Sequence, residues 1–190
     1  MSDEARATVS CHCSTCPRCC EQVRVPITHR DVRRLVDAVG ASASSFMDWL
    51  APEEVDMSGE PESFVELTEG RRIMMLRHEN AACHLLDCSG RCSQYAARPA
   101  ACAAYPFAFS DGTALQSRRL TILSDAPCTC VDWGNEDETQ RAVSCVEAEL
   151  NDYVAIVKRW NKQQTRRRFA GRRPRSASAF IEWLMNQPGT

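Results

Sequence analysis

Apolar side chains recur at helical spacing in three stretches of the chain. The first stretch follows Thr28, a residue type that often caps a helix, and ends at Gly40, a residue type that often terminates one. The second follows three acidic residues, 136–138, which suit the positive end of a helix dipole, and the third follows Ser176. We therefore predict three helices, and their apolar faces consist of Val32, Leu35, Val36 and Val39 in the first, Val143, Val146, Leu150, Tyr153, Val154, Val157 and Trp160 in the second, and Phe180, Ile181, Trp183 and Leu184 in the third.

Shorter apolar runs between turn residues predict strands. Residues 64–67 and 72–76 flank a Glu-Gly turn and predict a hairpin, and residues 115–123 alternate weakly and favour a further strand. Residues 42–50 begin with serines that can cap a helix, and Pro52 follows them, so we predict a short helix there.

These elements predict an α+β fold, in which a small metal-organised domain of short helices and antiparallel strands has a C-terminal helical extension. We place the cysteine-cluster domain at residues 11–134, and the amphipathic helix with a basic tail at residues 135–190. The 190 residues are 44% hydrophobic and 25% charged, with a formal net charge of −2, which is ordinary for a globular protein. No apolar run reaches the roughly 18–20 residues that span a bilayer, so we expect no membrane partner. Residues 1–10 are polar and do not resemble a secretion signal, so we expect a cytoplasmic protein.

The unusual feature of the composition is cysteine, of which the chain has 12. In a reducing cytoplasm, many cysteines indicate metal ligands or redox groups rather than structural disulfides. A secreted disulfide scaffold is the alternative, which the N-terminal sequence and the chain length disfavour. Buried structural thiols are another alternative. They suit Cys145 on the predicted long helix, but not five cysteines within residues 11–20.

The first cysteine-rich stretch has the spacing C-x2-C-x2-C and then one more cysteine, and its members are Cys13, Cys16, Cys19 and Cys20. This spacing lets one tight turn aim several thiolates at one metal centre, and it also begins the bacterial ferredoxin run. A single C-x2-C pair would equally suit zinc. The third cysteine favours an iron–sulfur cubane, because its four irons spread the ligands over more space. Neighbouring side chains tend to diverge, so we do not expect Cys19 and Cys20 to share one zinc ion.

Two later stretches supply further thiols, namely Cys83, Cys88, Cys92 and Cys102, and then Cys128 and Cys130. Together with the first stretch, these suffice for two four-ligand sites or for one site with spare thiols. His12 and His84 neighbour candidate ligands, but we expect them to support a ligand or to face solvent. We expect His29 and His78 to be solvated.

Arg98 and Pro99 lie between Cys92 and Cys102, and they allow two interpretations. The arginine can donate to a cluster sulfur or offset thiolate charge. Alternatively, the proline stops a helix and the arginine is exposed. We expect Tyr95 and Phe107 to be core residues rather than catalytic ones.

The order and spacing of these cysteines resemble the CxxCxxCC, or YkgJ-like, cysteine-cluster family, which is described as chelating zinc or iron. The resemblance also rests on Tyr95, on Arg98-Pro99 and on Tyr105-Pro106, and it covers roughly residues 11–134. It implies an iron–sulfur cluster, which we favour, or zinc. The cysteines of the family pattern are Cys13, Cys16, Cys19, Cys20, Cys83, Cys92 and Cys102, with the last position at Cys130 or Cys128. Cys11, Cys88 and Cys145 are additions to the pattern.

Residues 158–175 carry nine lysines or arginines and no acidic residue. Such a segment can bind the phosphates of a nucleic acid, but we favour a solvated segment or one that pairs with the acidic remainder of the chain. No phosphate loop, nucleophile elbow or HExxH helix indicates a kinase or hydrolase. Three functions stay open. The first is a metal-binding module, which can also bind a protein partner, and the second is an iron–sulfur enzyme with redox or group-transfer chemistry. The third is an adaptor that binds a partner or nucleic acid through the basic segment.

Overall fold

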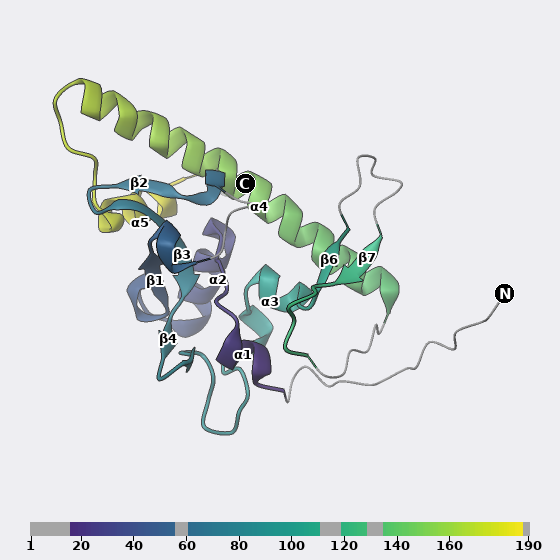
Figure 1. The fold of residues 1–190 in the computed structure, drawn as a ribbon. Coiled ribbons are helices and arrows are strands. Elements are labelled where there is room, and N and C mark those ends of the chain that lie inside the picture. The colour runs from purple at the N-terminus through teal and green to yellow at the C-terminus, as the bar shows by residue number, and fades with distance from the viewer. Residues whose placement is uncertain (1–15, 56–60, 111–118, 129–134, 188–190) are drawn as a thin grey trace.

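The computed structural model describes residues 16–55, 61–110, 119–128 and 135–187, and it confirms the predicted α+β class (Figure 1). The helices of these residues are α1 (Arg18–Gln22), α2 (His29–Val39), α3 (Ala100–Ala104), α4 (Glu136–Phe169) and α5 (Ala177–Met185). The strands are β1 (Met47–Leu50), β2 (Val65–Leu67), β3 (Gly70–Leu76), β4 (His78–Glu79), β5 (Ala82–Cys83), β6 (Phe107–Phe109) and β7 (Leu120–Ile122).

The three helices that apolar periodicity predicts are confirmed as α2, α4 and α5. Thr28 and Asp31 form a reciprocal capping box at the start of α2. Gly40 ends this helix with a φ of 67°, in the left-handed region that glycine adopts readily. The side chains of Asn135 and Ser176 accept backbone N–H groups at the starts of α4 and α5. Local capping and periodicity therefore agree at all three helices.

A three-stranded antiparallel sheet has the order β1-β3-β2, and β2 and β3 form the predicted hairpin. Of the helix predicted over residues 42–50, a turn of 3-10 helix is present at Ala43–Ser45. The remainder of the prediction is wrong, because residues 47–50 form β1, in which Met47 pairs with Leu76. The second half of β3 is buried. Its backbone groups need partners on both edges, and this pairing overrides the local sequence pattern.

Two smaller hairpins complete the strands. β4 pairs with β5, and β6 pairs with β7 through Phe107 and Ile122. The strand predicted over residues 115–123 is present over residues 120–122, whereas residues 111–118 lie outside the described residues.

An apolar core is shared by α2, the three-stranded sheet, α4 and α5. Trp160 and Phe180 are fully buried, and their rings pack edge to face with centroids 5.1 Å apart. Trp49 of β1 packs against Phe180 in the same way at 5.7 Å, and the Trp160 Nε1 donates to the Glu66 carbonyl at 2.9 Å. Figure 1 shows α4 running the length of the molecule past the sheet. The division of the chain at residue 134 stays a prediction.

His29 is buried, so the prediction that it is solvated is wrong. Its ring stacks on that of Tyr153 with 6.5 Å between the centroids. Neither ring nitrogen of His29, nor the hydroxyl of Tyr153, has a hydrogen-bond partner in the part of the chain that the structure describes. Burial lowers the pKa of His29 to about 4, because the charged imidazolium would lose its hydration, so the ring is neutral at pH 7.

The basic residues 158–175 occupy the last turns of α4 and the loop to α5. Two of their cations pair with acidic residues in or just before β2: Lys158 with Glu62 at 2.6 Å, and Arg168 with Glu66 at 2.8 Å. These pairs agree with the interpretation in which the basic segment neutralises the acidic remainder of the chain.

Candidate metal centre

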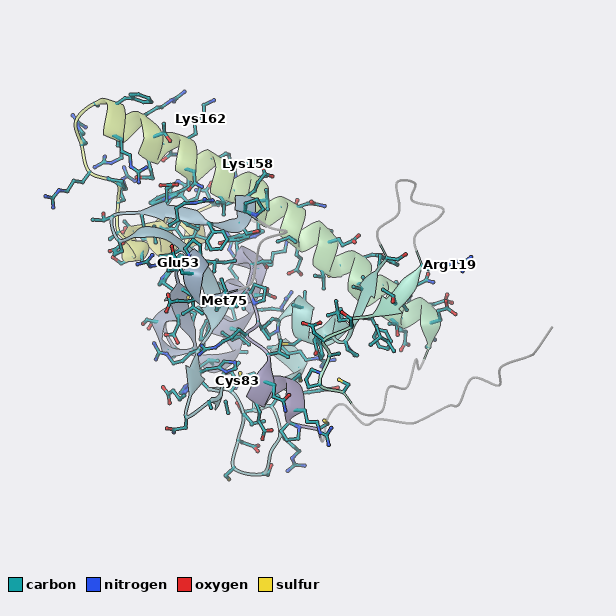
Figure 2. The ribbon with its side chains drawn as sticks, in the orientation of Figure 1. Glu53, Met75, Cys83, Arg119, Lys158 and Lys162 are labelled. Carbon is teal, nitrogen blue, oxygen red and sulfur yellow. The ribbon has the colours of Figure 1, made fainter. Side chains whose placement is uncertain are left out.

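Several cysteines converge at one end of the fold, although they come from four different elements. α1 carries two of them, and β5 ends with a third that lies beside α1 (Figure 2). The loop after β5 folds back through a short backbone bridge at the fourth cysteine, Cys92, and α3 carries the fifth, Cys102. The two on α1 are Cys19 and Cys20, and the one at the end of β5 is Cys83.

These five cysteines and Cys16 line one cavity of about 50 Å³. A cavity needs about 10–15 Å³, measured in the same way, to hold one water molecule, so this cavity has room for a group of several atoms. Two cysteine-rich stretches that lie far apart in the sequence thus contribute thiols to the same space. Six of the nine predicted ligands come together here, and whether they bind metal stays a prediction.

The other three predicted ligands are Cys13, Cys128 and Cys130. Cys13 and Cys130 lie outside the described residues. Cys128 is described, and it lies within electrostatic range of Tyr105. Burial raises the pKa of Tyr105 to about 12, and negative charge on the neighbouring Cys128 and Cys19 thiolates adds to this effect. Cys128 therefore lies near the cysteine cavity without forming its wall.

The sulfurs of Cys19 and Cys20 lie 4.0 Å apart. Two thiolates on one tetrahedral zinc ion, each about 2.3 Å from the metal, would be about 3.8 Å apart. The prediction that these two side chains diverge is therefore wrong, because both sulfurs turn toward the same cavity from adjacent positions of α1. Among the described residues, however, no group of three or more Cys, His, Asp or Glu side chains is arranged to hold a single metal ion.

The thiols of the cavity influence one another's ionisation. A hydrogen bond from the Cys20 thiol lowers the pKa of Cys19 to about 7, and the same interaction, together with burial, raises the pKa of Cys20. Burial also raises the pKa of Cys83 and of Cys102, and the neighbouring thiols add to this effect. Metals bind thiolates, so binding here must release protons from several thiols.

Arg98 is the single charged residue among the described residues that line the cavity. Its guanidinium lies 3.9 Å from the ring centroid of Tyr95 and donates to the Tyr95 carbonyl at 2.8 Å. Tyr95 is 40% exposed, so the prediction that it is a core residue is wrong. Pro99 follows a turn of 3-10 helix, Tyr95–Ala97, and immediately precedes α3, so a helix does end just before the proline. Arg98 lines the cavity and is half-buried, so a role in offsetting thiolate charge also stays a prediction.

A buried carboxylate holds α3, and with it Cys102, against α2. Asp31 is 1% exposed, and in addition to capping α2 it accepts the backbone N–H of Ala100 at 3.0 Å. Arg34 pairs with Asp31 and also with Glu149 of α4, the latter at 3.0 Å. In the sequence, Asp31 stands three residues after Thr28, which suggests only the second member of a capping box. No local signal predicts its bond to Ala100, because the two residues are far apart in the chain.

The remaining cysteines and histidines that the structure describes do not line the cavity. Cys88 is exposed, and Cys145 on α4 is exposed and donates to Glu149 at 3.6 Å. The Nδ1 of His84 lies 3.3 Å from a Glu79 carboxylate oxygen, and both side chains are more than one-third exposed, which agrees with a surface role. Cys11 and His12 lie outside the described residues.

Comparison with known protein families identifies the domain. The sequence model of one family matches residues 12–146, which is well over half of the chain. The chain belongs to the CxxCxxCC family. This family is described as a "putative zinc- or iron-chelating domain", so the comparison supports metal binding. No curated protein and no solved structure matches the chain. Within the described ranges, no helix has both the length and the apolar character that crossing a bilayer requires.

The residues of this CxxCxxCC domain fit a thiolate-bound metal group. Soft thiolates select zinc or the iron of iron–sulfur clusters over magnesium or calcium, which prefer oxygen ligands. The described wall of the cavity offers six thiols and no carboxylate. Its volume admits more than one atom. Donor type, donor number and space therefore agree with a zinc- or iron-chelating site.

Proposed function

We propose that the chain is a binding module for an iron–sulfur cluster, with zinc as the alternative metal. The observation that carries this proposal is the single cavity lined by six cysteine side chains. A structural zinc ion takes four ligands, whereas this cavity offers six sulfurs and room for several atoms. No three described ligand side chains are arranged for a single ion. These observations favour a cluster, whose thiolates stand farther apart than those of one ion.

The proposed ligands come from the cysteines of the family pattern. When bound, a cluster supplies electron transfer or Lewis-acid chemistry. The chain's own part is to hold the thiols and to balance their charge. Arg98 in the cavity wall offsets negative charge, and Asp31 fixes the helix that carries Cys102. The proposed ligand set is drawn from Cys13, Cys16, Cys19, Cys20, Cys83, Cys92 and Cys102, with Cys128 and Cys130 as further candidates.

Matched serine variants test this proposal. Cys19→Ser and Cys102→Ser each remove a thiol from the cavity, whereas Cys88→Ser removes an exposed thiol of the same cysteine-rich region. We expect the anaerobically purified wild-type chain to contain iron and sulfide and to absorb visible light. The two cavity variants should lose most of this iron, because a neutral serine hydroxyl is a much poorer ligand than a thiolate. The Cys88 variant should keep it.

The metal content also decides between the alternatives. A colourless protein with stoichiometric zinc, lost in the Cys19 and Cys102 variants, would identify zinc as the metal at the same cavity. Iron that is retained in both cavity variants would show that the ligand set is wrong. A chain that is isolated without either metal, with its thiols paired as disulfides, would contradict the proposal altogether.

A further inference from the structure

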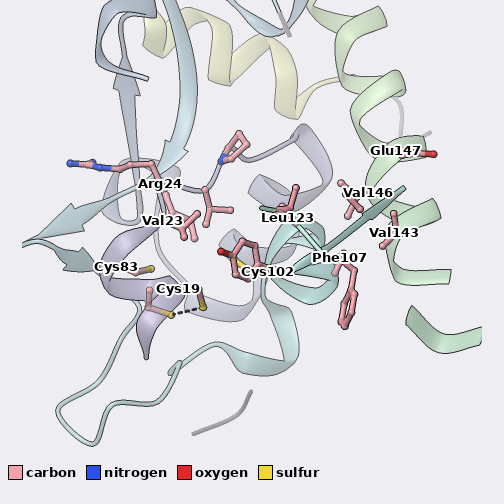
Figure 3. A pocket seen from close by; sticks show the side chains of 18 of the residues that line it. Cys19, Val23, Arg24, Cys83, Cys102, Phe107, Leu123, Val143, Val146 and Glu147 are labelled. Atoms are coloured by element: carbon pink, nitrogen blue, oxygen red, sulfur yellow. Dashed lines mark hydrogen bonds between the residues drawn. The ribbon is translucent and has the colours of Figure 1, made fainter. Parts of the chain in front are cut away.

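A second, larger cavity adjoins the cysteine cavity. Its volume is about 330 Å³, and its walls come from α1, the residues that follow α1, β3, β5, α3, β6, the segment after β7 and α4 (Figure 3). Sites for small molecules in proteins span about 300–1,000 Å³, so this cavity lies at the lower end of that range. Its walls come from many elements rather than from one loop, so the fold itself shapes it.

The walls of this cavity are apolar. Arg24 and Glu147 are its two charged residues in the described part of the chain, and Figure 3 shows both directing their charged groups away from its interior. A charged ligand would therefore lose its hydration without gaining an ionic partner, which is costly. An apolar ligand would remove apolar side chains of the wall from contact with water, which is favourable. Leu123, which is 39% exposed, is one such side chain. The apolar wall includes Val23, Phe107, Leu123, Val143 and Val146.

The two cavities share four cysteines, namely Cys19, Cys20, Cys83 and Cys102. Figure 3 shows Cys19 and Cys83 at one side of the larger cavity, Val143 and Val146 at the opposite side, and Cys102 between them. A molecule that fills the larger cavity must therefore approach the same sulfur atoms that line the smaller one. This continuity distinguishes the larger cavity from a packing defect elsewhere in the core.

We propose that the larger cavity binds an uncharged, largely apolar small organic molecule, one end of which lies against the shared cysteines. Binding to the cavity goes beyond the proposed function and does not depend on it. Only the contact of the bound molecule with a metal group rests on the proposed function. A ligand placed there would lie beside the metal centre, which is the arrangement that an iron–sulfur enzyme, rather than a purely structural module, requires.

Binding of an uncharged apolar dye, N-phenyl-1-naphthylamine, to the full chain tests this proposal. Val146→Trp fills the cavity from α4, whereas Val154→Trp makes the same change two turns along the helix at a half-buried position that does not line it. Ala108→Leu fills the cavity from β6 and serves if the first variant does not fold. We expect saturable binding with enhanced fluorescence in the wild-type chain, at least tenfold weaker binding in either filled variant, and unchanged binding in Val154→Trp.

Metal content, measured on the same samples, separates this proposal from the proposed function. Dye binding that the filled variants lose, in a chain without iron or zinc, would uphold the cavity and contradict the metal proposal. A metal-loaded chain that binds no dye would overturn the cavity proposal. Equal dye binding in Val146→Trp, Ala108→Leu and Val154→Trp would also overturn it, because the dye would then bind elsewhere.

Discussion

The change Asp31→Asn replaces one carboxylate oxygen with an amide group and removes a buried negative charge. Both oxygens are in use in the native structure. Oδ1 accepts the Ala100 N–H at 3.0 Å and pairs with Arg34, and Oδ2 accepts the Thr28 N–H at 2.8 Å. Asparagine has a single carbonyl oxygen, so one of these donors must face an NH₂ group instead. Either the cap of α2 or the contact with α3 is therefore lost.

The cost of this change follows from the groups that lose a partner. A hydrogen bond to a charged acceptor contributes about 1.5–3 kcal/mol, and a donor left buried without a partner costs about 1–3 kcal/mol. These two amounts overlap, because part of each describes the loss of the same hydrogen bond. Arg34 keeps Glu149 as its partner at 3.0 Å, so its own charge stays compensated. We expect the free energy of unfolding to fall by about 2–4 kcal/mol in Asp31→Asn. The matched change Asp37→Asn, at an exposed position of α2, should cost less than about 0.5 kcal/mol.

Urea unfolding at pH 7 measures this difference, and two further measurements test whether Asp31 positions the metal centre. We expect faster alkylation of Cys102 by iodoacetamide, followed by mass spectrometry, and less bound metal per folded chain in Asp31→Asn. Equal unfolding free energies in the Asp31 and Asp37 variants would refute the reasoning about the buried network. A loss of stability with unchanged alkylation of Cys102 and unchanged metal content would show that Asp31 stabilises the fold without positioning α3.

Two further predictions concern the core. Burial lowers the pKa of His29 from 6.5 to about 4, so the folded state binds its proton more weakly than the unfolded state, and stability is lost as the pH falls below about 6.5. The loss from this group should reach about 2 kcal/mol at pH 5. Urea unfolding at pH 7 and pH 5 should show a smaller pH effect in His29→Phe, and an equal effect in both proteins would contradict this account. Phe180→Ala should lower the free energy of unfolding by about 3–5 kcal/mol, because the Phe180 ring is fully buried against Trp160. The control Phe169→Ala changes a side chain that is 89% exposed, so it should change this free energy by less than about 0.5 kcal/mol. Similar thermal unfolding of the two variants would argue against the packing described.

The sequence predicts those elements whose determinants are local. Helix α2 has its capping box, its apolar face and its terminal glycine within about a dozen residues, so pattern alone locates it. Residues 47–50 have no such local determinant. They form a strand because β3, later in the chain, offers an unpaired edge to them. Secondary structure that depends on a distant partner cannot be read from periodicity within a short window.

The same distinction applies to the candidate site. The spacing of the cysteines predicts a shared centre, and the structure brings six of them to one cavity. The bond between Asp31 and Ala100, and the burial of His29, have no signature in the neighbouring sequence. The exposure of Tyr95 is equally hidden, since an aromatic residue between cysteines suits a core as well as a cavity rim. Residue types indicate the chemistry of the site, whereas its supporting contacts depend on the tertiary fold.

The loop between β5 and α3, residues 84–99, is the part of the candidate site with the least regular structure of its own. Its regular structure in the described residues is a single turn of 3-10 helix, and its hydrogen bonds are mostly local, as from the Ser93 N–H to the Leu85 carbonyl at 2.8 Å. Leu85 and Pro99 are buried near its two ends, and Cys92 reaches the cavity from between them. Ordering such a loop costs about 1–2 kcal/mol of backbone entropy per residue, and this loop buries little apolar surface in return. If Cys92 is a metal ligand, as we propose, a metal–thiolate bond would tether the loop at its middle, and the fold would then need to hold only the two ends.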